Sequence, residues 1–70
     1  MSKIFVKDKM ELKKSLMKKG YNIREFSDKC NVSNSYMSSI INGNTNLSAP
    51  LSKKISDELE LKFSDIFFIQ

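Results

Sequence analysis

The chain has 70 residues, a net charge of +4 and one cysteine, Cys30. This length allows one domain, residues 1–70. A lone thiol excludes an internal disulfide, and the early apolar run from Ile4 to Val6 is too short for a signal peptide or a membrane span. We therefore expect a cytoplasmic protein, and its basic charge favours nucleic acid over an acidic substrate as a partner.

Missing residue types exclude most kinds of chemistry. The chain contains no histidine, so it lacks the usual acid–base group at neutral pH and the commonest metal ligand. Its two glycines are too few for a phosphate-binding loop. The acidic residues Asp57, Glu58 and Glu60 would leave a helix in different directions. We expect no enzymatic activity, no metal site, no cofactor and no small-molecule ligand.

Two helices are predicted in the first half of the chain. The first covers about residues 8–19 and ends at Gly20, and its apolar face is expected to consist of Met10, Leu12, Leu16 and Met17. The second begins after Asn22, which can form a capping box with Glu25. Its buried face is predicted from residues at three- and four-residue spacing: Ile23, Phe26, Ser27 and Cys30.

A third helix is predicted over residues 34–42, with Ser33 as its N-cap and Gly43 as its stop signal. An Asn-Gly pair also occurs in hairpin turns, so a strand is the alternative. The apolar residues before the pair follow a period of 3.6 and favour the helix: Tyr36, Met37, Ile40 and Ile41.

The last part of the chain predicts a fourth helix and a closing segment. The helix begins after Ser48 with Pro50 in its first turn, and a short helical turn follows at Phe63. Residues 3–6 and 66–69 are both apolar and β-prone, and we expect them to pair as a small two-stranded sheet. The alternative is that residues 67–69 form the contact between two copies of the chain.

The outer face of the third helix is polar but uncharged, because residues 30–46 contain no charged side chain. On a helical wheel, Asn34, Ser38 and Asn42 fall within about 80°, and Ser35 and Ser39 widen that arc to about 140°. Short amides and hydroxyls suit the hydrogen-bond patterns of base edges. The second and third helices, joined by a turn at residues 31–33, also have the lengths of a helix-turn-helix motif, residues 23–42.

The chain resembles the Cro/C1-type helix-turn-helix family, the lambda-repressor-like XRE domains, from Leu12 to Phe67. The matching positions are Leu16, Gly20, Asn22, Phe26-Ser27, Val32-Ser33, Ile40-Ile41-Asn42-Gly43, Ile55, Leu59 and Ile66. The resemblance implies an all-α fold, a compact bundle of four to five helices containing the helix-turn-helix. It also implies a sequence-specific transcriptional regulator of phage-repressor, Cro or small bacterial type, which binds double-stranded DNA as a homodimer with the recognition helix in the major groove.

The resemblance also implies which residues contact DNA. The expected base readers are Asn34, Ser35, Ser38 and Ser39. The expected phosphate contacts are Asn22, Arg24, Ser33, Asn42 and Asn44. The family often has Gln where this chain has Ile23, and it commonly places Arg, Lys or Gln on the recognition helix. We therefore expect discrimination to use adenine through Asn and thymine methyl groups through Ile41 or Tyr36.

A protein-interaction module is the alternative function. An antitoxin or an antirepressor partner could reuse this fold and bury Tyr36, Met37 or the phenylalanine cluster near the end of the chain in another protein. The fold alone does not decide between these functions.

Overall fold

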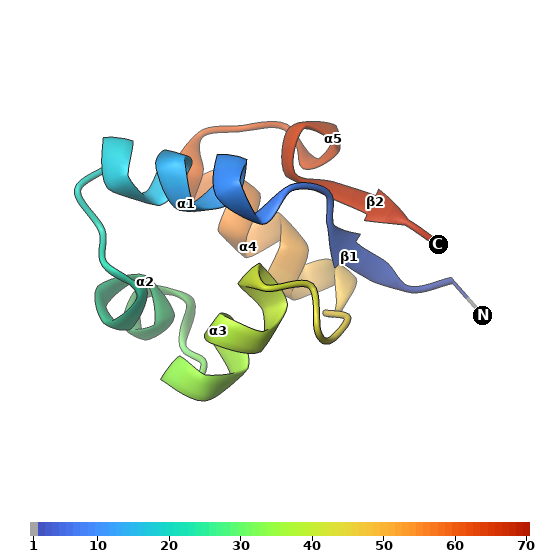
Figure 1. The fold of residues 1–70 in the computed structure, drawn as a ribbon, viewed down its shortest axis with the longest axis horizontal. Helices are drawn as coiled ribbons and strands as arrows, with labels where there is room; N and C mark the ends of the chain where they lie inside the picture. The colour runs from blue at the N-terminus through green and yellow to red at the C-terminus, as the bar shows by residue number, and fades with distance from the viewer. Residues whose placement is uncertain (1) are drawn as a thin grey trace.

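The computed structural model describes residues 2–70. The elements in chain order are β1 (Ile4–Val6), α1 (Lys9–Lys18), α2 (Ile23–Cys30), α3 (Asn34–Ile41), α4 (Ala49–Leu59), α5 (Phe63–Ile66) and β2 (Phe67–Ile69). Figure 1 shows the strand pair at the end of the molecule where both chain termini lie, opposite the turn between α1 and α2. This architecture confirms the predicted helical bundle, its helix-turn-helix and its small sheet.

The helices begin at the polar residues that the sequence predicts as caps. Asn22 Oδ1 accepts from the Glu25 N–H at 2.7 Å, and Glu25 Oε1 accepts from the Asn22 N–H at 3.1 Å, which completes the capping box. Ser33 and Ser48 cap α3 and α4 through their hydroxyl oxygens. These side chains satisfy backbone donors that a helix leaves free in its first turn, so local chemistry fixes where each helix starts.

Four chain reversals use the left-handed backbone conformation. Gly20 (φ 80°) follows α1 and Gly43 (φ 77°) follows α3, as the sequence predicts. The other two are Asn31 (φ 62°), between α2 and α3, and Glu60 (φ 56°), after α4. Asn tolerates this conformation better than most residues, whereas Glu does not, and no pattern in the sequence indicates Glu60.

The two strands form an antiparallel pair that joins the ends of the described chain. Ile4 lies opposite Ile69, Phe5 opposite Phe68 and Val6 opposite Phe67. Lys3 and Gln70 exchange two backbone hydrogen bonds of 3.1 and 2.7 Å. On the other edge of β1, the Leu47 N–H donates to the Ile4 carbonyl at 3.1 Å, so the segment before α4 is attached to the sheet.

The core lies where the helices meet the inner face of this sheet. Its fully buried side chains include Phe26 of α2, Met37 and Ile40 of α3, Ile55 of α4 and Phe67 of β2. Three serines are also buried, and their hydroxyl groups donate to carbonyls of their own helices: Ser27, Ser52 and Ser56. These bonds remove most of the cost of burying a hydroxyl.

One expectation for α1 is wrong. Leu12 and Leu16 are buried, but Met10 and Met17 are 60% and 73% exposed. The two methionines lie about 100° or more around the helix from the buried leucines, on a part of α1 that stays largely exposed. Within residues 2–70, no helix is both long and apolar enough to cross a membrane.

Candidate nucleic-acid interface

Helices α2 and α3 form a bihelical unit around a tight turn. The Asn31 N–H donates to the Asp28 carbonyl at 3.1 Å, and the Val32 N–H donates to the Ser27 carbonyl at 3.0 Å. The left-handed Asn31 then directs the chain away from α2, and Ser33 starts α3. This is the geometry of a helix-turn-helix, with α3 as its second helix.

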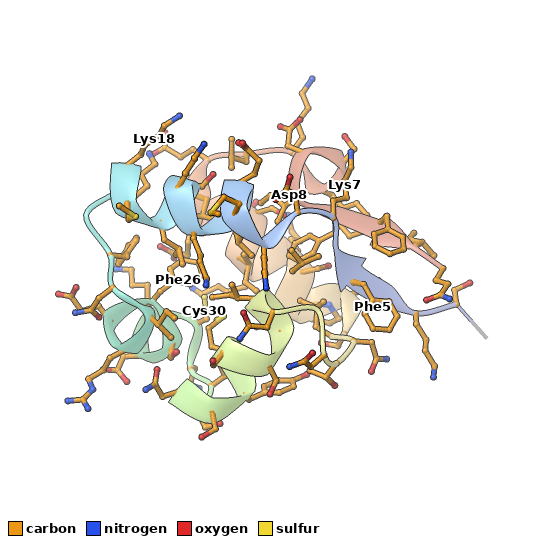
Figure 2. The ribbon with its side chains drawn as sticks, viewed as in Figure 1. Phe5, Lys7, Asp8, Lys18, Phe26 and Cys30 are labelled. Carbon is orange, nitrogen blue, oxygen red and sulfur yellow. The ribbon has the colours of Figure 1, made fainter. Side chains whose placement is uncertain are left out.

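Buried side chains fix the angle between the two helices. Phe26 and Cys30 extend from α2 toward the centre of the molecule (Figure 2), and both are buried. Met37 and Ile40 of α3 have no exposed surface and belong to the same core. Burial raises the pKa of the Cys30 thiol to about 11, with a smaller contribution from Glu58, so Cys30 packs as an apolar residue and not as a nucleophile.

The outer face of α3 carries the predicted base readers. Asn34 and Ser35, in its first turn, are exposed, whereas Ser38 and Ser39 are half-buried. Within residues 2–70, no hydrogen bond engages the side chains of these four residues. Their amide and hydroxyl groups are therefore available to an external partner, and Asn34 and Ser35 are the more accessible pair.

The predicted phosphate contacts are all exposed. Ser33 and Asn42 cap the two ends of α3, Asn44 follows α3, and Asn22 and Arg24 lie at the start of α2. Asn22 and Ser33 use an oxygen to cap a helix, but the Asn22 amide N–H groups and the Ser33 O–H can still donate. Phosphate accepts hydrogen bonds, so capping does not compete with the expected contact.

Ile41 cannot contact a thymine methyl group. The helical wheel places it at the border of the polar face, but the side chain has no exposed surface. Helices α1 and α2 and strand β1 all pack against α3, so the buried arc of α3 is wider than a wheel of the isolated helix suggests. Tyr36 is 37% exposed and stays accessible at that border.

The charge distribution separates this face from the rest of the surface. No charged residue occurs between Lys29 and Lys53, a stretch that includes all of α3 and the loop after it. The four ion pairs of the described residues lie on α1 and α4, or join α1 to the end of α4.

In residues 2–70, no group of three or more Cys, Asp or Glu side chains could hold a metal ion.

A helix-turn-helix whose second helix presents a polar outer face is the architecture of a class of DNA-binding domains. The chain belongs to the helix-turn-helix family HTH_3, the XRE/Cro-C1 type, whose sequence profile matches residues 12–66. The family consists of DNA-binding domains, and membership supports DNA binding by this chain. No curated protein and no solved structure matches the chain significantly.

Proposed function

We propose that the protein is a sequence-specific regulator of transcription that inserts α3 into the major groove of double-stranded DNA. The observation that carries this proposal is the outer face of α3, where Asn34 and Ser35 present unbonded amide and hydroxyl groups in the first helical turn. Recognition helices of this motif contact base edges with their N-terminal residues. Arg24 at the start of α2 and Asn44 after α3 then bind phosphates on either side.

We propose a repressor or Cro-like action, because occupying an operator is the simplest use of a DNA-binding domain. A domain that binds an operator and contains α1 to α5 can block RNA polymerase by occupying DNA, and this requires no further activity. Selection of randomised duplexes with the purified protein tests the proposal. We expect enrichment of a two-fold symmetric site that contains A·T pairs, because Asn pairs bidentately with adenine. Binding that is weak, abolished by salt and without enrichment would contradict it.

We further propose that the DNA-bound form is a homodimer joined through β2. Lys3 and Gln70 form a hydrogen-bonded pair between the two strands. Because such pairs alternate along an antiparallel ladder, the next pair, Ile4 and Ile69, is not hydrogen-bonded, and the Ile69 N–H and carbonyl point to the open edge of the sheet. Residues 67–69 contain no charge and no proline to block that edge. Phe68 and Ile69 are also 43% and 60% exposed, which favours a contact between two copies there.

The oligomeric state tests this contact. We expect the wild-type chain to sediment as a dimer at micromolar concentration and Ile69→Lys to sediment as a monomer, because a charge at an edge opposes strand pairing. Lys14→Gln, on the exposed side of α1, is a control for the change in surface charge and should remain dimeric. A wild-type chain that stays monomeric both alone and on its selected duplex would contradict the proposal.

A protein-interaction module is the second candidate function. The exposed Phe68 and Ile69 favour it, because they are adjacent on β2 and contiguous apolar surface is typical of contact sites. Met37 cannot take part, since it is fully buried. The absence of an enriched duplex in the selection would favour this function over DNA recognition.

A further inference from the structure

The loop between α3 and α4 is attached to the rest of the protein at both ends. At its start, the Asn44 N–H donates to the Ser39 carbonyl of α3 at 2.9 Å. At its end, the Leu47 N–H donates to the Ile4 carbonyl of β1 at 3.1 Å. Between these points, no backbone–backbone hydrogen bond of the described residues involves Thr45 or Asn46. The middle of the loop therefore depends on side chains for its position.

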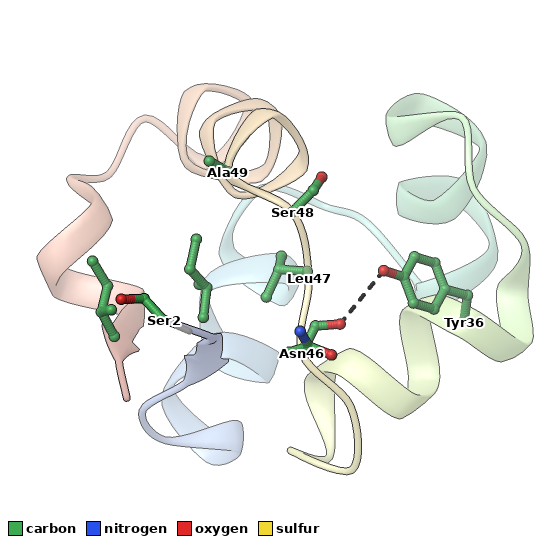
Figure 3. A pocket seen from close by; sticks show the side chains of 8 residues that line it. Ser2, Tyr36, Asn46, Leu47, Ser48 and Ala49 are labelled. Carbon is green, nitrogen blue, oxygen red and sulfur yellow. Dashed lines mark hydrogen bonds between the residues drawn. The ribbon is translucent and has the colours of Figure 1, made fainter.

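Tyr36 supplies the contact from α3. Its hydroxyl donates to the Asn46 carbonyl at 3.5 Å, and the Thr45 hydroxyl donates to the same oxygen at 3.4 Å. Figure 3 shows the Tyr36 side chain reaching from α3 toward Asn46, with the hydrogen bond at its tip. The bond crosses from the first turn of the recognition helix to the far end of the loop, ten residues later.

Packing does not hold the loop on this side. A hollow of about 510 Å³ lies beside the ring, and it is lined by Ser2, Ile4, Tyr36, Asn46, Leu47, Ser48, Ala49 and Ile69. This hollow leaves open space beside the loop, and Figure 3 shows the residues that line it. Side-chain hydrogen bonds to the Asn46 carbonyl therefore replace packing as the restraint on the middle of the loop.

We infer that Tyr36 is a positioning residue for DNA binding: its hydroxyl holds the α3–α4 loop in fixed register with the recognition helix. This inference rests on the proposed function, in which Asn34 reads a base and Asn44 binds a phosphate. A loop fixed before binding loses less conformational entropy on the DNA. The Tyr36 hydroxyl, which is turned toward Asn46, then affects affinity without reading a base itself.

Amide hydrogen exchange of the free protein tests the restraint without DNA. In Tyr36→Phe, we expect the Asn44 and Leu47 amides to exchange about two- to threefold faster, the lower end of the range for one lost hydrogen bond, because this bond is long at 3.5 Å. The Phe26 amide, bonded to the Asn22 carbonyl within α2, should be unchanged. Unchanged exchange at Asn44 and Leu47 would overturn the inference, even if the protein binds DNA.

DNA binding tests the consequence. Tyr36→Phe should bind its selected duplex and single-base variants of that duplex about two- to threefold more weakly, with the same order of preference, because the lost bond is a long one. Ethylation of the phosphate that Asn44 contacts should also interfere less. A changed base preference would make Tyr36 a base reader and overturn the inference. Equal affinity of wild type and variant would overturn it as well.

The matched control is Tyr21→Phe, which removes the other tyrosine hydroxyl of the chain. Tyr21 lies between α1 and α2, with its ring 5.2 Å from that of Phe26, and it does not contact the loop. We expect the affinity of Tyr21→Phe for the selected duplex, and the exchange rates of its Asn44 and Leu47 amides, to equal those of the wild type. If it reproduces the effect of Tyr36→Phe, a general loss of stability would explain both variants and overturn the inference. If no duplex is enriched, the proposed function fails while the exchange experiment still decides the restraint.

Discussion

Asn34 combines three properties that suit a base reader. It lies in the first turn of α3, its side chain is exposed, and no hydrogen bond within residues 2–70 engages its amide. An asparagine amide can both donate to and accept from an adenine edge, which a serine hydroxyl cannot do bidentately. The adenine preference of the protein should therefore depend on this residue more than on the serines beside it.

Asn34→Ala should lose discrimination at one position of each half-site. We expect binding of the preferred duplex to weaken by about 1–3 kcal/mol and binding of duplexes with another base at that position to change little. Competition titrations with single-base variants measure this difference. Asn44→Ala is the comparison, because loss of a phosphate contact should weaken all duplexes alike. A uniform loss in Asn34→Ala would show that Asn34 does not read a base.

Glu60 is the residue with the least favourable backbone conformation. Its φ of 56° follows α4, and its carboxylate lies 3.0 Å from the Lys19 ammonium group. A side chain at positive φ costs about 1 kcal/mol relative to glycine, whereas an exposed ion pair contributes about 0–1 kcal/mol. The backbone strain lowers the stability of the fold and the ion pair raises it, so two substitutions at Glu60 must be compared to separate these effects.

Glu60→Gly should be more stable to urea than Glu60→Ala by about 1 kcal/mol, because both lose the ion pair and only glycine removes the strain. Equilibrium unfolding by circular dichroism measures the difference. Equal stability of the two variants would mean that the turn after α4 relaxes at no cost.

Residue chemistry made the caps predictable but not this turn. Asn22, Ser33 and Ser48 cap helices because of their own side chains and their near neighbours in sequence. Glu60 is left-handed because Leu61 must return to the core, where its N–H donates to the Ser56 carbonyl. That requirement comes from tertiary packing, which a local pattern does not contain.

Strand β2 has one buried aromatic residue and one exposed aromatic residue side by side. Phe67 is 2% exposed and packs against Phe63 with 5.4 Å between ring centroids. Phe68 is 43% exposed and stacks on Phe5 at 6.1 Å. Successive residues of a strand face opposite sides, so Phe67 packs in the core and Phe68 lies on the surface.

Substituting each residue separates these contributions. Phe67→Ala should lose about 3–5 kcal/mol of unfolding free energy, as for other buried aromatic residues. Phe68→Ala should lose no more than about 1.5 kcal/mol, the usual range for an aromatic pair. Urea titrations at low protein concentration measure both values. Comparable losses in the two variants would contradict the assignment of Phe67 to the core.

The elements were largely predictable, and the errors lie at their edges. Period and caps locate the helices because amphipathic helices must bury one face. They do not show how much of the helix surface the neighbours cover. Helix α3 has neighbours on several sides and buries Ile41, whereas α1 leaves Met10 and Met17 open. For the same reason, period and caps do not predict the hydrogen bond between Tyr36 and Asn46, because that bond depends on the path of the loop.

At the scale of the whole molecule, the positive charge lies outside α3, the helix that is proposed to read DNA. Most lysines lie outside the helix-turn-helix, many of them on α1 and α4, and the segment between Lys29 and Lys53 is neutral. Phosphate contacts from α3 and the loop after it must therefore come from amides, hydroxyls and backbone N–H groups, and α2 adds only the cations Arg24 and Lys29. Such neutral donors bind phosphate without replacing a bound cation one for one.

We expect a shallow salt dependence of DNA affinity. The logarithm of the binding constant falls with the logarithm of salt concentration by about 0.9 for each phosphate that a cationic group neutralises. Titrations of the selected duplex at several salt concentrations should give fewer than about eight released ions. A slope that corresponds to eight or more would mean that lysines outside the helix-turn-helix reach the DNA backbone.

The pairing of β1 with β2 has a consequence for synthesis of the chain. Val6 leaves the ribosome well before its sheet partner, Phe67, which lies more than sixty positions later. The five helices between them, α1 to α5, can begin to form earlier from local contacts, but the core cannot close before Phe67 is synthesised. Until then Val6 and the neighbouring core side chains remain exposed to chaperones and proteases. The closed fold therefore requires synthesis through at least Phe67, because α2 and α3 have only 8 residues each and depend on the shared core for their stability.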